Sequence, residues 1–157
     1  MSSPIKLDQT DRKILNILQK HAKITNAQLS KDIDLSPAPT LERVKKLENS
    51  GIIESYHAKL NGHLLGLNIY AFVSVKLKNY NKKSHNSFIS KIEDIDEVIE
   101  SHSVTGKGDY LLKVVAKDVS AYEDVVRDRI SAIDDVSSLE SMVILSTSKD
   151  SKVIPVP

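Results

Sequence analysis

The sequence predicts an α+β protein of two domains, and two observations carry that prediction. Apolar residues recur at helical spacing in the first third of the chain, whereas period-two alternation begins after Gly62 and Gly66. We therefore expect an N-terminal winged helix-turn-helix domain at residues 1–60. Residues 61–157 are expected to form a ferredoxin-like βαββαβ domain.

Three helices are expected in the first domain. Asp8 is the expected N-cap of a helix that reaches about His21, and Thr25 or Asn26 starts a second, shorter helix. A D-L-S connection at 34–36 then leads directly into a third helix. A tight turn between a second and a third helix is the helix-turn-helix arrangement. The apolar positions expected to face the core are Ile14, Leu15, Leu18, Ala27, Leu29 and Ile33.

The third helix has clear start and stop signals. Ser36 is expected to cap it with its side chain, prolines at 37 and 39 suit the first turn, and Gly51 ends it. Residues 53–60 then have the character of a wing strand. The three-residue spacing predicts a buried stripe of Leu41, Val44 and Leu47. The outer faces would then carry Thr40, Glu42, Arg43, Lys45 and Lys46.

The clearest strand of the second domain is residues 69–77, where apolar residues alternate. Its opposite face carries Tyr70 and Phe72, so we expect a partner subunit or a second layer to cover that face. A helix containing Phe88 and Ile92 follows. Strands at 98–104 and 110–116 are joined by the T-G-K-G-D turn. A helical stripe from Tyr122 to Ile133, a last strand at 139–147 and a loose or subunit-contacting tail at 148–157 complete the chain.

The amino-acid composition excludes several kinds of chemical site and several classes of protein. Absence of cysteine excludes disulfides, thiolate zinc sites and cysteine nucleophiles. No signal peptide or membrane-spanning run is evident, so we expect a cytoplasmic, nucleoid-associated protein without membrane partners. Residues 1–60 hold ten Lys plus Arg against seven Asp plus Glu, a net +3, and residues 61–157 hold twelve against fourteen, a net −2. The signs agree with a nucleic-acid-facing first domain.

Enzymatic interpretations fit the sequence poorly. The five histidines show no metal-ligand spacing, and the chain has no P-loop, no G-x-G-x-x-G and no G-x-S-x-G motif. The E-D-I-D-E stretch at 93–97 is interpreted as a helix end and loop. We therefore expect a protein that is not an enzyme, with no catalytic residues, no metal and no cofactor.

The chain resembles the Lrp/AsnC family of feast/famine transcription regulators over about residues 7–149. The resemblance is carried by L-D-Q-T-D-R-K-I-L at 7–15, by L-S-P-A-P-T-L-E-R-V-K-K-L-E at 35–48 followed by G-I-I, by V-T-G-K-G-D-Y-L-L-K at 104–113 and by D-V-S-A-Y at 118–122. It implies a DNA-binding helix-turn-helix domain tethered to a ferredoxin-like (RAM) domain. That second domain would form homodimers, assemble them into an octamer (a tetramer of dimers) and sense a free amino acid.

The third helix is the expected reader of double-stranded DNA. Arg43 can donate two bonds to a guanine edge, and the alternative is a surface ion pair with Glu42 or Glu48. Thr40 and Ala38 are short enough to approach a thymine methyl, or they simply fill the first turn. Lys45 and Lys46 are expected on phosphates, the alternative being a solvated pair. The complete expected DNA-binding set is Ser36, Pro37, Ala38, Thr40, Arg43, Lys45 and Lys46.

The resemblance places the amino-acid effector near the T-G-K-G-D turn. Small residues there let backbone N–H groups approach a carboxylate, and Asp109 could meet the ligand ammonium or bond its own backbone instead. Lys107 could contact a neighbouring dimer. Because a characterised relative carries an aromatic residue at the position of Gly108, effector identity is not transferred. The expected effector-binding set is Thr105, Gly106, Lys107, Gly108, Asp109 and Tyr110.

The competing interpretation is a small-molecule sensor whose output is a protein partner, with the helix-turn-helix serving only for docking. Salt separates the two classes. DNA binding should weaken steeply as salt rises, whereas a docking module should show no duplex affinity at physiological salt.

Overall fold

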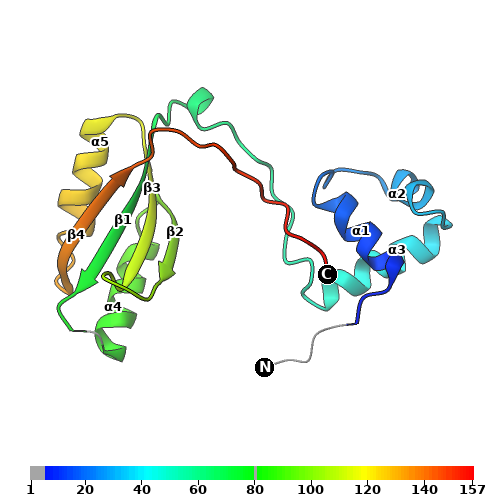
Figure 1. Ribbon diagram of the computed structural model, residues 1–157, viewed down its shortest axis with the longest axis horizontal. Helices are drawn as coiled ribbons and strands as arrows, with labels where there is room; N and C mark the ends of the chain where they lie inside the picture. Colours follow the sequence, from blue (N-terminus) through cyan, green and yellow to red (C-terminus); the bar gives the residue numbers. More distant parts are fainter. Residues whose placement is uncertain (1–5, 80) are drawn as a thin grey trace. The chain divides into compact units, whose positions relative to one another are not determined.

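The computed structural model describes residues 6–79 and 81–157, which form two compact units (Figure 1). One unit contains the chain up to Lys59 together with Lys149–Pro157, and the other is Leu60–Ser148. The sequence analysis assigned residues 149–157 to the second domain, but in the structure they lie with the first unit.

The first unit contains the three expected helices, α1 (Gln9–Leu18), α2 (Asn26–Asp32) and α3 (Pro37–Asn49). Asp8 caps α1 as predicted, and Thr25 caps α2 by accepting a hydrogen bond from the Gln28 backbone N–H. Helix α1 ends three residues earlier than the expected His21. The three helices share one hydrophobic core, formed by Ile14, Leu15, Leu18, Leu29, Ile33 and Leu47.

The turn between α2 and α3 is fixed by backbone geometry. Asp34 adopts a left-handed conformation with φ of 57°, which aspartate tolerates better than most residues. The Leu35 N–H then donates to the carbonyl of Ser30 at 2.9 Å, and the Asn26 amide donates to the carbonyl of Pro37 at 2.8 Å. Both bonds fix the start of α3 against α2.

The predicted wing strand is absent, since described residues 53–60 form no strand. The α3 helix ends as expected at Gly51, whose φ is +74° and whose N–H donates to Glu48. The chain beyond it is held by side chains: Tyr56 donates to the Glu48 carboxylate at 2.9 Å. Extended backbone becomes a strand only when a neighbouring strand pairs with it, and sequence periodicity does not report that partner.

The second unit is built on a four-stranded antiparallel sheet of order β2-β3-β1-β4. Its strands are β1 (Ile69–Leu77), β2 (Val98–Ser103), β3 (Tyr110–Ala116) and β4 (Val136–Val143). With α4 (Lys82–Glu93) and α5 (Val119–Asp124) this is the predicted βαββαβ order. A 3-10 turn, η1 (His63–Leu65), precedes the sheet, and a π-helical segment, η2 (Val125–Ile130), continues α5.

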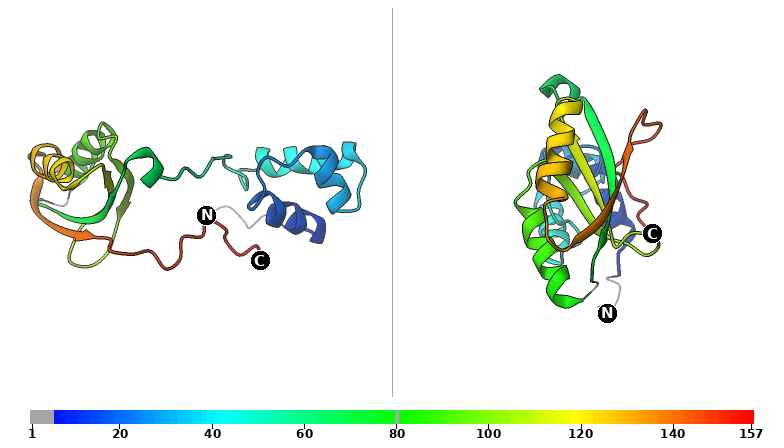
Figure 2. Two further views of the ribbon diagram at one scale, coloured as in Figure 1. Left: turned by 90° about the horizontal axis from the view of Figure 1, so that it is seen from above. Right: turned by 90° about the vertical axis from the view of Figure 1, so that its left-hand side faces the viewer.

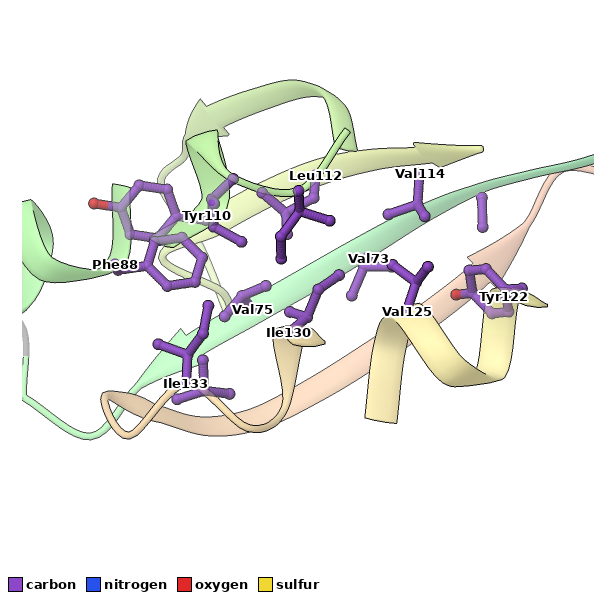
Figure 3. Packing of buried hydrophobic residues seen from close by; sticks show 14 of the residues in the cluster. Val73, Val75, Phe88, Tyr110, Leu112, Val114, Tyr122, Val125, Ile130 and Ile133 are labelled. Carbon is purple, nitrogen blue, oxygen red and sulfur yellow. The ribbon is translucent and has the colours of Figure 1, made fainter. Parts of the chain in front are cut away.

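The main core lies between one face of this sheet and the helices. Figure 2 shows α4 and α5 on the same side of the sheet. Val73 and Val75 of β1 point toward Phe88 of α4 and Ile130 of η2, all fully buried (Figure 3). The alternation predicted for 69–77 is confirmed, because Ala71, Val73, Val75 and Leu77 are buried and the intervening side chains are not.

The last strand starts and ends earlier than predicted. Residues 136–143 form β4, whereas 139–147 were expected. Val136 pairs with Leu77, just beyond a register shift between Lys76 and Leu77, and lies in the core. The strand starts earlier than expected because Val136 is both paired and buried. Beyond Val143 the ladder ends, and Leu145 is almost fully exposed.

The tail at 149–157 packs on the first unit. The side-chain amide of Gln19 makes two hydrogen bonds with the backbone of Ile154, accepting at 2.7 Å and donating at 3.1 Å. Lys59 and Asp150 form an ion pair at 2.8 Å. Val156 packs against the core of the first unit. The tail is therefore part of the helical unit's packing.

Candidate nucleic-acid interface and effector site

The exposed side of α3 begins with three short residues and ends with two lysines. Ser36, Pro37 and Ala38 are exposed at its start, and Lys45 and Lys46 are exposed about two to three turns later. In the described part of the chain neither lysine enters an ion pair. This side of α3 therefore carries only short side chains at its N-terminal end and two positive charges farther along the helix.

The predicted phase of α3 is wrong by one position. Thr40 was expected outward, but it is completely buried, and its hydroxyl donates to the carbonyl of Ser36 at 2.9 Å. Leu41 was expected inward but is 43% exposed. The inward stripe is Thr40, Val44 and Leu47, since steps of four and three residues follow the 3.6-residue period more closely than two steps of three.

The first turn of α3 offers few backbone donors. Ser36 adopts N-cap geometry, but its side chain makes no capping hydrogen bond, contrary to expectation. Prolines occupy positions 37 and 39 and carry no N–H, and the Thr40 N–H donates to Ser36 at 3.3 Å. Of positions 37–39, only Ala38 has an N–H to offer a phosphate.

Arg43 bonds two aspartates from another helix. Its Nη1 donates to the Asp8 carboxylate at 2.6 Å and to the Asp11 carboxylate at 2.7 Å, and its side chain is 35% exposed. The sequence analysis considered ion pairs with Glu42 or Glu48 instead. A D-x-x-D spacing at a helix start is a capping signal, but it does not reveal which cation will join it.

The turn between β2 and β3 is open to solvent at its tip. Thr105, Gly106 and Lys107 are all exposed, and Gly106 adopts a φ of +127° that favours glycine. Its base is closely packed. A Cβ at Gly108 would overlap the Ser74 hydroxyl oxygen and lie 3.3 Å from the carbonyl oxygen of Val75. Sequence reasoning did not identify Ser74 as a neighbour of this turn.

Asp109 and Tyr110 are integrated into the fold. One carboxylate oxygen of Asp109 accepts a hydrogen bond from the Leu77 N–H at 2.8 Å. Tyr110 is fully buried, stacks 4.5 Å from Phe88 between ring centroids, and its hydroxyl bonds the imidazole of His85. The structure thus brings residues 105–109 together at the turn but places the Tyr110 ring in the core (Figure 3).

The sheet face opposite the helices carries partly buried apolar side chains. Phe72 lies in the centre of this face, opposite Met142 on β4 and Lys113 on β3, and Tyr70 lies two residues before it. Met142 is 44% exposed in the chain. These apolar side chains support the expectation that a partner subunit or a second layer covers this face.

The described residues offer neither a membrane span nor a metal site. Within residues 6–79 and 81–157, no helix combines the length and apolar character needed to cross a bilayer. The same residues contain no group of three or more His, Asp and Glu side chains able to hold a metal ion.

Comparison with known proteins identifies both units. Residues 7–54 match the winged helix-turn-helix DNA-binding family, and residues 70–154 match the Lrp/AsnC ligand binding domain. A DNA-binding domain joined to an amino-acid-binding domain defines a transcriptional regulator that responds to a small effector. The chain belongs to the Lrp/AsnC family of such regulators, as its sequence motifs predicted.

Relatives cover nearly the whole chain. The leucine-responsive regulatory protein of Klebsiella pneumoniae is 39% identical over 145 residues, 92% of this chain and 88% of its own length. Its Escherichia coli K12 counterpart is 38% identical over the same span. A transcriptional regulator from Neisseria meningitidis, crystallised with L-Met, is 33% identical with a TM-score of 0.91, covering 96% of this chain and 97% of its own. The structure of Escherichia coli AsnC is 29% identical with a TM-score of 0.88, and the match covers 96% of this chain and 100% of that chain.

These comparisons confirm the α+β architecture and the regulatory class. The relatives are transcriptional regulators. As a member of this family, the protein binds DNA through its helix-turn-helix unit and an amino acid through its second unit.

Proposed function

We propose that the protein reads operators through the exposed side of α3. The observation that carries this proposal is the pair of unbridged lysines, Lys45 and Lys46, on the same exposed side as Ala38. Lysines of this kind bind phosphates and set the register of a helix on the duplex, while short side chains allow close approach to base edges. Ser36, Pro37 and Ala38 would make that approach. Buried Thr40 takes no part.

Salt dependence tests this assignment. A duplex selected by the wild-type protein from random sequence is titrated at several salt concentrations with Lys45→Ala, Lys46→Ala and, as a matched control in the second unit, Lys82→Ala. Each α3 variant should bind more weakly and lower the salt slope by about one, because one phosphate contact is lost. Equal slopes for all three variants would contradict the assignment.

We propose that the outer sheet face forms a homodimer and that dimers assemble into an octamer. Support comes from the apolar side chains Tyr70, Phe72 and Met142 on a face that the chain's own helices do not cover. A dimer would present two α3 helices to successive major grooves, about 34 Å apart. Analytical ultracentrifugation of Phe72→Lys should show smaller species than wild type, whereas Lys83→Ala, at an exposed position on α4 and away from this face, should leave assembly unchanged.

We propose that the effector amino acid binds at the β2–β3 turn. Support comes from the exposed backbone at Thr105, Gly106 and Lys107 above a closely packed base formed by Gly108 and Asp109. Consecutive N–H groups of such a turn can hold a carboxylate. Calorimetry with each of the twenty amino acids should give binding that Lys107→Ala weakens. No heat from any amino acid would exclude the turn as the effector site.

A DNA-binding oligomer of this kind would be retained on the nucleoid, and we include that location in the proposal. Crosslinking followed by capture of bound genomic fragments, with and without an amino-acid mixture, should recover discrete fragments whose set changes with the mixture.

A further inference from the structure

Arg43 is the one cation of the α3 segment 36–50 that is bonded inward. Its Nη1 lies 2.6 Å from Asp8 Oδ2 and 2.7 Å from Asp11 Oδ1, bridging α3 to the first turn of α1. The Asp11 side chain is only 7% exposed, whereas that of Asp8 is 52% exposed. The bridge therefore runs from a buried carboxylate to a half-exposed one.

Both aspartates are themselves fixed by a capping box. Asp8 Oδ1 accepts the Asp11 N–H at 2.8 Å, and Asp11 Oδ2 accepts the Asp8 N–H at 3.2 Å. Each carboxylate thus uses one oxygen to cap α1 and the other to bind Arg43. Because the capping box sets the positions of both Arg43-binding oxygens, it also sets where α3 lies against α1.

The electrostatics of this trio do not suit a DNA contact. One guanidinium between two carboxylates leaves a formal charge of −1, so a phosphate brought to Arg43 would meet a net negative cluster. The hydrogen bonds from the Asp11 N–H and from Arg43 hold the pKa of Asp8 below its usual value. Lys45 and Lys46, by contrast, enter no ion pair within the described chain.

We propose that Arg43 is a positioning residue that fixes the angle of α3 on the capping box of α1 and so sets the sequence specificity of DNA binding, without itself contacting DNA. This inference rests on the proposed role of α3 as the DNA-reading helix. Lys45 and Lys46 then supply attraction to the duplex, and Arg43 supplies the orientation that lets the short first turn reach the bases.

The test asks whether removing an aspartate charge strengthens or weakens DNA binding. Asp8→Asn and Asp11→Asn each remove a negative charge from a DNA-binding unit, so simple electrostatics expects tighter binding. If Arg43 positions α3, both variants instead bind the selected duplex more weakly, by about fivefold or more, while binding to a scrambled duplex does not weaken. Glu54→Gln is the charge-matched control, since Glu54 is exposed on the segment after α3. Full-length protein is used throughout, with anisotropy as the readout.

Arg43→Gln completes a double-mutant cycle with Asp11→Asn. We expect each single variant to lose specific affinity to a similar extent, the double variant to lose little more, and the salt slope to stay at the wild-type value. Should Arg43→Gln fail to fold, Asp8→Asn still decides the matter, because asparagine caps a helix as well as aspartate.

Unchanged or tighter binding by Asp8→Asn and Asp11→Asn would overturn the inference. A salt slope lowered by about one in Arg43→Gln, on the selected and scrambled duplexes alike, would also overturn it by indicating a direct phosphate contact. These outcomes leave the proposed function intact. Absence of any wild-type affinity for duplex DNA would instead remove the proposed function itself.

Discussion

Asp109 accepts a hydrogen bond from the backbone N–H of Leu77 at 2.8 Å, which ties the base of the β2–β3 turn to the end of strand β1. The Asp109 N–H in turn donates to the carbonyl of Val75 at 2.8 Å. Asp109 therefore joins the turn to the strand twice, by a side-chain bond to Leu77 and a backbone bond to Val75. Any movement of the turn on ligand binding would be transmitted directly to β1.

Removing this carboxylate should destabilise the second unit. Asp109→Ala leaves the Leu77 N–H without its acceptor, so we expect the free energy of unfolding to fall by about 1–3 kcal/mol. Asp109→Asn keeps a carbonyl acceptor and should restore most of that loss. Urea denaturation followed by circular dichroism measures both. If the asparagine variant is stable yet binds amino acids more weakly, the Asp109 charge also contacts the ligand ammonium.

Gly108 should tolerate no side chain unless Ser74 is also changed. In Gly108→Ala the new methyl group would overlap the Ser74 hydroxyl, and we expect a loss of about 1–3 kcal/mol of unfolding free energy. Ser74→Ala removes that oxygen and should recover part of the loss in the double variant. No recovery would indicate that the approach to the Val75 carbonyl, at 3.3 Å, dominates instead.

Thr40 should act on stability and Lys45 on DNA affinity. Thr40→Val removes a buried hydroxyl that donates to Ser36, and we expect a cost of about 1 kcal/mol with unchanged discrimination between selected and scrambled duplexes. Lys45→Ala should instead leave stability unchanged and weaken binding to both duplexes, because a phosphate contact does not depend on sequence. Thermal melting and anisotropy on the same two variants check the contrast. A Thr40→Val protein with normal stability and relaxed specificity would contradict the assigned packing.

The C-terminal tail should stabilise the helical unit through Val156. Val156 packs against its core, whereas the Ile154 side chain is 68% exposed and bonds Gln19 only through its backbone. Val156→Ala should therefore increase amide exchange in α1, with a cost of up to about 1 kcal/mol. Ile154→Ala should have little effect. Hydrogen exchange measured by mass spectrometry resolves the helical unit from the sheet.

Acid should weaken the link between α1 and α3. The pKa of Asp8 is lowered from its ordinary value of 3.8 by its hydrogen bonds to the Asp11 N–H and to Arg43. A depressed carboxyl pKa contributes stability that is fully present above 3.8 and is lost as pH falls through the lower folded value. Amide exchange in α1 should accordingly rise below pH 3.8 in wild type and depend less on pH in Asp8→Asn. Equal pH dependence in the two proteins would contradict this.

The order and type of nearly every element follow from local signals in the sequence. The bounds of β1 and β3 follow from strict alternation and from the polar turn between β2 and β3, and the caps at Asp8 and Thr25 follow from local hydrogen bonding. Signals of this kind involve residues close in the chain. The family motifs are equally local, which is why the regulatory class was accessible from the residues alone.

The side of α3 that faces inward could not be predicted from local spacing, because it depends on contacts with distant parts of the chain. Residues 40–47 offer two overlapping stripes, one containing Leu41 and the other Thr40, and hydrophobicity favours the wrong one. The structure pairs Arg43 with the aspartates of the α1 capping box, more than thirty positions away, and buries Thr40. Long-range charge pairing and core packing are set by which surfaces meet in three dimensions, and no local spacing records that.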